Sequence, residues 1–253
     1  MMEWIKVRKA RLGGGASFSR EVLGQHYCAR YICHSNHRLQ NDGGKRMRGL
    51  AAVVCLAFLL SACAVGNSHR YDLGNAEFEL DSEKSVAVSV VDLRPYVVDG
   101  DKEPKFTGLF RGGFGNPFDV TTNSGRPLAE DLTNSIVAAL KRDGIDAKAV
   151  QVKAQTNEAG ARSLILASQA DRCSVLYVRE WKSDTYFNTG LDYNLMLEVL
   201  SSDGSVIASQ VVKGHDNLGP AGVPADARVA VEEAVKAKLE ALFNAAEIQA
   251  AFD

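Results

Sequence analysis

Alternating apolar and polar residues divide the chain from residue 76 to its end into strands and helices. Val86, Val88 and Val90 alternate with smaller residues, which predicts a first strand over 85–93. Pro127 opens a segment with acids in its first turn, one apolar face and Gly144 as a stop signal, which predicts a helix over 127–144. Alternation returns over 191–199, and the turn signal Ser-Ser-Asp-Gly that follows it predicts an antiparallel strand over 205–212.

The remaining patterns complete one α+β domain. They predict a short strand near 147–152, a helix over 157–170, a buried strand over 173–181 and a final helix over 226–250. One stripe of apolar residues runs along the final helix: Val231, Val235, Leu239, Leu242 and Ala246. We therefore predict a two-layer sandwich in which a mixed or mainly antiparallel sheet carries the helices on one face.

A separate apolar stretch, Leu50–Cys63, precedes the domain. It is shorter than the roughly 20 residues that a membrane-spanning helix needs. Lys45, Arg46 and Arg48 stand directly before it, so it has the charged start and short apolar centre of an export signal. Secretion of the chain is the expected consequence.

The end of that stretch, Leu60-Ser61-Ala62-Cys63, resembles the lipobox of bacterial lipoprotein precursors. The resemblance implies that a diacylglycerol is attached to the Cys63 thiol, that cleavage occurs before Cys63, and that the new amino group is acylated. Several acyl chains would anchor the chain stably without any protein helix in the bilayer. The resemblance divides the sequence into a signal peptide over 47–62, a lipidated tether over 63–75 and a domain over 76–253.

The 46 residues before Met47 do not fit an export signal, which normally stands at the N-terminus. They show no helical or strand periodicity, so we expect translation to start at Met47 and residues 1–46 to be a mis-annotated or disordered extension. Cys28, Cys33, His34 and His37 offer four side chains that can bind zinc. Their spacing does not fit a Cys2His2 finger, so no metal site is expected.

Charge changes the picture of the mature part. Ten Lys and Arg but only three Asp and Glu precede Cys63, which leaves 19 basic and 28 acidic residues from Cys63 on, a net charge of −9. Nucleic acid is bound chiefly through neutralisation of its phosphates, so it is excluded as a partner. Cys173 is the one further cysteine of the mature part and is expected to be a small buried hydrophobe.

Nucleophilic catalysis would require a base beside a nucleophile. The mature part has two histidines: His69 in the predicted tether, and His215 in a predicted solvated loop after the last strand. Ser124 and Ser209 are conceivable partners of His215, but neither lies in a G-x-S-x-G elbow. No catalytic residue is therefore predicted, and the domain is not expected to be an enzyme.

Cofactor binding is not indicated either. The glycines at 112, 113 and 115 are not followed by the Gly-Lys-Ser/Thr of a phosphate loop. Asp192 and Glu198 look like acids on a solvated face. The expected cofactor is accordingly none.

The segment 97–124 is predicted to be a long loop, because four glycines and a proline within 105–118 disfavour a helix. It contains the candidate partner-binding residues Phe106, Phe110, Arg111, Phe114 and Phe118. Exposed aromatics and arginine would suit contact with a partner protein, a lipid headgroup or a glycan. The alternative is that the phenylalanines fold back and cap one end of the core, and the sequence leaves both open.

The first strand ends in Val91-Asp92-Leu93-Arg94 before a long segment and the helix over 127–144, and in this the mature chain resembles the YajG-like Gram-negative lipoproteins. The expected function is that of a non-catalytic binding or structural component of the cell envelope. Its expected place is the outer membrane, facing the periplasm, because residue 64 lacks the aspartate that retains many lipoproteins in the inner membrane. An auxiliary lipoprotein of an ABC-type lipid-transport system and an envelope hydrolase with an unrecognised site remain as alternatives.

Overall fold

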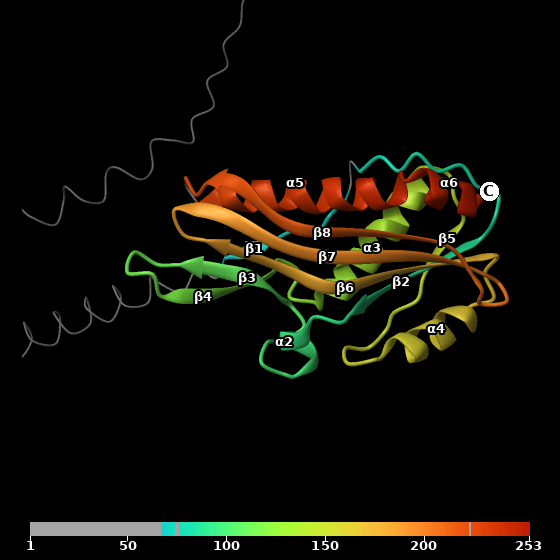
Figure 1. The fold of residues 1–253 in the computed structure, drawn as a ribbon, viewed down its shortest axis with the longest axis horizontal. Helices are drawn as coiled ribbons and strands as arrows, with labels where there is room; N and C mark the ends of the chain where they lie inside the picture. The colour runs from blue at the N-terminus through green and yellow to red at the C-terminus, as the bar shows by residue number, and fades with distance from the viewer. Residues whose placement is uncertain (1–66, 74–75, 223) are drawn as a thin grey trace, which may run out of the picture. The chain divides into compact units, whose positions relative to one another are not determined.

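The computed structural model describes residues 67–73, 76–222 and 224–253 (Figure 1). The predicted signal peptide, the lipobox with Cys63 and the Cys28–His37 group lie outside the described residues. Within the three described ranges, no helix has the length and apolar character needed to cross a bilayer.

Eight strands of the described ranges form one mixed, strongly curled sheet. The long strand β6 organises it: β7 runs antiparallel along one edge of β6, while β2 and then β3 run parallel along the other edge. Outward from these, β8 pairs with β7, β5 with β2, β4 with β3, and β1 with β4. The strands are β1 (Ser68–His69), β2 (Val86–Asp92), β3 (Phe106–Arg111), β4 (Pro117–Thr122), β5 (Ala147–Ala149), β6 (Arg172–Thr185), β7 (Asn188–Ser201) and β8 (Val206–Pro220).

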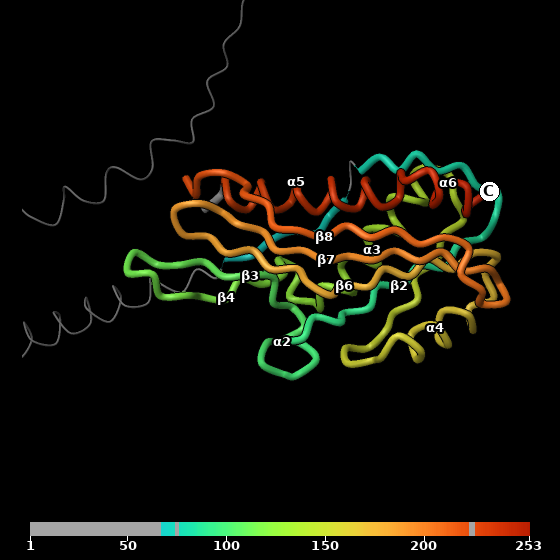
Figure 2. Tube along the Cα trace, in the orientation of Figure 1, coloured from blue at the N-terminus to red at the C-terminus, as the bar shows by residue number. Residues whose placement is uncertain are grey.

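The larger core lies between one face of this sheet and the helices α3 (Leu128–Arg142), α5 (Pro224–Phe243) and α6 (Ala246–Phe252). Alternate residues of β7, such as Leu195 and Leu197, point into this core. Figure 2 shows α5 and α6 following β8 along its length.

The opposite face is covered in part by α4 (Glu158–Leu166), whose Ala161 and Ile165 pack on Val175 and Tyr177 of β6. The prediction that helices lie on one face only is therefore wrong. Ala161 and Ile165 are four residues apart and give α4 one apolar side that packs on the sheet. The sequence does not indicate which of the two faces of the sheet this helix covers.

Most of the predicted elements are confirmed. The strand over 85–93 is β2, the helix over 127–144 is α3, and the turn after Ser201 joins the antiparallel strands β7 and β8. The buried Cys173 is also confirmed, with 1% of its surface exposed. These segments carry strong local signals, including the acids in the first turn of α3 and the basic residues in its last turn.

The predicted final helix is broken in two. Ala245 is extended, with φ −65° and ψ 133°, and separates α5 from α6. Asn244 explains the break: its side chain accepts a hydrogen bond from the Glu79 amide and donates one to the Glu77 carbonyl. These two hydrogen bonds hold Asn244 to the extended segment around Glu77 and Glu79. Ala246 therefore does not lie on the buried stripe predicted for the final helix, and it is exposed.

The predicted tether is too long. His69 of β1 pairs with Thr122, and Tyr71 and Leu73 are buried in the larger core. The Tyr71 hydroxyl accepts a hydrogen bond from Trp181 Nε1 at 2.9 Å, and burial raises the pKa of Tyr71 to about 12. Residues 67–73 therefore belong to the domain.

Candidate functional site at one end of the sheet

The predicted loop over 97–124 forms a short helix, α2 (Pro95–Val98), and a β-hairpin of β3 and β4. Phe110 pairs with Phe118 and Arg111 with Pro117 across the hairpin. Residues 112–116 make its tip, closed by a hydrogen bond from the Gly112 amide to the Asn116 carbonyl at 2.9 Å. The glycines that argued against a helix are thus compatible with a hairpin.

Close approach to β6 explains why this segment becomes a strand. Gly108 pairs with Ser183, and a Cβ at position 108 would lie 2.0 Å from Ser183 Oγ and 2.5 Å from the Ser183 carbonyl oxygen. Glycine therefore permits the pairing that fixes the hairpin to the sheet.

The predicted partner-binding phenylalanines differ in their exposure to solvent within the hairpin. Phe106 is buried and makes an edge-to-face contact with Tyr96, so it is a core residue. Phe110 is half-buried, whereas Phe114 is 98% and Phe118 56% exposed. The hypothesis of core-capping phenylalanines is right for Phe106, and exposure is right for Phe114 and Phe118.

Arg111 is engaged within the domain. Its Nε and Nη2 atoms donate to the two carboxylate oxygens of Asp184 on β6, at 2.8 and 2.6 Å. The side chain is 36% exposed. Arg111 therefore helps to hold the hairpin on β6 rather than presenting a free cation.

A second pair of exposed aromatics lies at the same end of the sheet. Tyr186 and Phe187 form the turn between β6 and β7, are 38% and 76% exposed, and have ring centroids 4.0 Å apart. Phe110 of β3 pairs with Thr185 of β6, and these two strands are parallel. The hairpin tip and the β6–β7 turn therefore project beyond the same end of the sheet, as Figure 1 shows. We call Phe114, Phe118, Tyr186 and Phe187 the aromatic end.

The aromatic end carries no charge of its own. The segments 112–118, 185–191 and 217–222 contain no Asp, Glu, Lys, Arg or His. The third segment is the end of β8, and it joins the cluster through the hydrogen bond from the Ala221 amide to the Phe187 carbonyl at 2.9 Å. Two of the flanking acids form ion pairs, Asp184 with Arg111 and Asp119 with Lys102. A third, Asp226 in the first turn of α5, has its carboxylate against Gly222.

The first strand of the domain is directed away from this end. β1 is parallel to β4, and β4 begins at the hairpin tip, with Ser68 opposite Thr121. The chain therefore enters the sheet from the side of the aromatic end.

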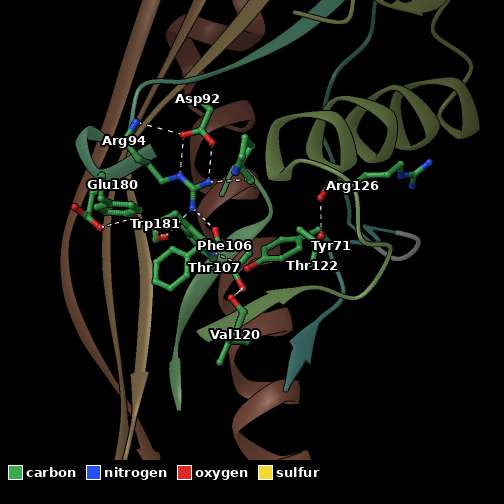
Figure 3. Close-up of polar contacts among 12 residues, drawn as sticks. Tyr71, Asp92, Arg94, Phe106, Thr107, Val120, Thr122, Arg126, Glu180 and Trp181 are labelled. Atoms are coloured by element: carbon green, nitrogen blue, oxygen red, sulfur yellow. Dashed lines mark hydrogen bonds and ion pairs between the residues drawn. The ribbon is translucent and has the colours of Figure 1, made fainter. Parts of the chain in front are cut away.

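The Asp92-x-Arg94 sequence proves to be a buried structural network (Figure 3). Arg94 is fully buried, and its Nε and Nη2 atoms donate to Asp92 at 2.8 and 2.6 Å. Burial alone would lower the pKa of Arg94, but hydrogen bonding and the charge of Asp92 raise it above its ordinary value. The guanidinium also donates to the carbonyls of Pro104, Phe106 and Trp181.

This network lies where β6 changes partner from β2 to β3. The register of β6 shifts between Val178 and Glu180, and the chain leaves β2 at Asp92 and returns as β3 at Phe106. Arg94 satisfies carbonyls that the strand ladders leave free there. It therefore supports the hairpin but is not itself accessible.

The residues considered for catalysis are not brought together. His215 lies on β8 rather than in a loop, is 64% exposed, and contacts Asp192 through Nδ1 at 2.7 Å. Ser124 lies in the turn before α3, and its hydroxyl donates a hydrogen bond to Asp131 of that helix. Glu198 is buried and paired with Arg162, so its assignment to a solvated face is wrong. In the described ranges no three His, Cys, Asp or Glu residues are grouped as metal ligands would be.

His69 on β1 makes the stability of the folded domain depend on pH. Burial, and secondarily the charge of Arg228, lower the pKa of His69 to about 4, and its Nδ1 is buried without a hydrogen-bond partner. The unfolded histidine binds a proton near pH 6.5, so the folded state loses stability as the pH falls below that value and reaches its full loss near pH 4.

We expect His69→Leu to remove this loss. Between pH 7 and pH 5, the native chain should lose about 2 kcal/mol more unfolding free energy than the variant, as shown by urea unfolding at both pH values. His215→Leu is the matched control and should follow the native chain. Equal losses in the native chain and His69→Leu would show that His69 is not the group responsible.

No family model and no curated protein sequence matches this chain. Among solved structures, protein XCC0632 of the DUF330 family from Xanthomonas campestris is similar at 16% identity and a TM-score of 0.45, over 74% of this chain and 94% of that protein. The PelC dodecamer subunit from Paraburkholderia phytofirmans is similar at 16% identity and a TM-score of 0.31, over 64% and 90%. Lipoprotein GNA1162 from Neisseria meningitidis is similar at 12% identity and a TM-score of 0.26, over 61% and 96%. All three TM-scores lie below 0.5, so none of these likenesses carries a functional assignment.

Sequence reasoning missed Tyr186 and Phe187. Two adjacent aromatics between alternating segments were a usable signal, because a turn between two long strands exposes its side chains. That they lie at the same end of the sheet as Phe114 follows only from the parallel pairing of β3 and β6.

Proposed function

We propose that this chain is an envelope lipoprotein anchored through lipid on Cys63, whose domain acts as a non-catalytic binding or structural component facing the periplasm from the outer membrane. The observation that carries the proposal is the direction of β1. The chain enters the sheet from the side of the uncharged aromatic end, a few residues after the lipobox cysteine. That is the arrangement expected of a domain held to a membrane at one end.

The non-catalytic part of the proposal is supported by how the polar side chains are used. Arg94 and Asp92 hold the sheet together, Arg111 and Asp184 hold the hairpin, and Arg162 pairs with Glu198. These contacts commit six charged groups to the fold.

Lipid on Cys63 is tested by Cys63→Ala. We expect this variant to lose all labelling by a fatty-acid analogue in cells, because the thiol is the proposed acceptor, and to leave the membrane fraction, because several acyl chains supply the anchoring free energy. Cys173→Ala is the control, since Cys173 is a buried cysteine of the domain, and it should keep label and membrane association. Label that survives in Cys63→Ala would contradict the proposal.

Density-gradient separation of the two membranes tests the location of the labelled protein. We expect the label to travel with outer-membrane markers. Label confined to the inner membrane would contradict that part of the proposal and leave anchoring intact.

A further inference from the structure

We infer that the aromatic end inserts into the interfacial region of the same bilayer that holds the lipid on Cys63. The two aromatic turns are then the part of the domain that contacts the membrane. This inference rests on the proposed function and names the lipid surface as the partner of the aromatic end.

Four exposed aromatic side chains lie at this one end of the domain. Phe114 and Phe187 are 98% and 76% exposed, and each lies at the tip of a turn rather than against the body of the domain. Phe118 and Tyr186 lie beside them with more than a third of their surface exposed. Exposed apolar groups gathered on one surface mark a contact site, and aromatic side chains favour the boundary between headgroups and acyl chains.

The aromatic end also differs in charge from the rest of the mature chain. The mature chain carries a net charge of −9, which an anionic membrane surface repels. The three segments that make up this end contain no ionisable acid, and Asp184 and Asp119 behind them are paired with Arg111 and Lys102. The aromatic end can therefore approach headgroups without bringing an unpaired carboxylate with it.

The tether between Cys63 and β1 has the length needed to reach the aromatic end. Cys63 is five residues before Ser68, and Asn116 is five residues before Thr121, the partner of Ser68 in the parallel pairing of β1 with β4. A fully extended chain from Asn67 to Cys63 reaches at most about 14 Å, enough to bring Cys63 level with the hairpin tip.

The opposite end of the domain is out of reach of the same tether. The 14 residues of β7 span about 45 Å at 3.3 Å per residue. The β7–β8 turn at that end also carries Asp203, whose pKa is lowered to about 2 by hydrogen bonds from Ser201 and Ser205. A lipid on Cys63 therefore holds the aromatic end, and not the acidic turn, near the bilayer.

Tryptophan reporters in the lipidated protein test this inference. Phe114→Trp, Phe187→Trp and Val206→Trp variants are purified from membranes and placed in vesicles of phosphatidylethanolamine and phosphatidylglycerol, with and without bromine on the acyl chains. Val206 is the matched control, because it is 46% exposed and lies next to the β7–β8 turn at the far end. Trp181 is buried, and the unsubstituted protein measures its contribution.

We expect brominated lipid to quench the reporters at 114 and 187 at least about threefold more than the reporter at 206, since apolar groups at the interface are buried about 5–10 Å into the boundary between headgroups and acyl chains. Equal quenching at all three positions would overturn the inference. A protein partner for the same end would give that result together with crosslinks from positions 114 and 187 to another protein in cells.

Mass spectrometry of the same preparations separates the two possible failures. Protein that lacks acyl chains on Cys63 would refute the proposed function. Acylated protein with unquenched reporters at 114 and 187 would refute only the insertion of the aromatic end.

Discussion

Arg94→Met is expected to lower the free energy of unfolding by about 3–5 kcal/mol, the range observed when one partner of a buried ion pair is removed. The substitution keeps most of the side-chain volume but leaves the Asp92 carboxylate, which is 3% exposed, without its countercharge. It also removes the donors to the carbonyls of Phe106 and Trp181. Urea unfolding at pH 7 measures the change.

Two further variants show whether the loss comes from an unpaired buried charge. Asp92→Asn combined with Arg94→Met should be more stable than Arg94→Met alone, because the charge that lost its partner is then absent. Arg111→Met breaks a similar bidentate pair whose partners are about one-third exposed, and should cost no more than about 1 kcal/mol. An Arg94→Met chain within 1 kcal/mol of the native one would show that the network contributes little.

Gly108→Ala is expected to cost about 3 kcal/mol or more, the upper part of the range for overpacked positions. The new methyl group would overlap both the side chain and the backbone of Ser183, at 2.0 Å and 2.5 Å, and the backbone of a central strand cannot move aside. The hairpin of β3 and β4 should therefore separate from β6, and this can be measured as lost hydrogen-exchange protection in β3 together with lower stability in urea.

Gly113→Ala is the matched control for this experiment. A Cβ at position 113 meets nothing within 4 Å, so the variant should unfold within about 0.5 kcal/mol of the native chain. If Gly108→Ala proved as stable as Gly113→Ala, the close pairing of β3 with β6 would not be what holds the hairpin. Because that pairing also places the hairpin tip and the β6–β7 turn at the same end of the sheet, Gly108→Ala should disturb the aromatic end without altering any of its residues.

The sequence by itself determined the elements whose signals are local. The valine alternation of β2, the charged turns and stop signal of α3, and the Ser-Ser-Asp-Gly turn between β7 and β8 each depend on residues within a few positions of one another. Such signals act through backbone preference and one buried face, so they can be recognised without knowing the neighbours. The lipobox prediction is equally local, and it concerns residues outside the described part of the chain.

Only the tertiary structure decided how the candidate site is built. Gly108 permits a strand because Ser183 is its neighbour, Phe106 is buried with its ring against Tyr96 and Lys102, and Asn244 breaks a helix because it binds the segment near Glu79. The aromatic end joins two turns that are distant in sequence, and their adjacency follows from the parallel pairing of β3 with β6. Contacts between distant segments depend on strand order and register, and these are set by the packing of the whole sheet rather than by any local pattern of residues.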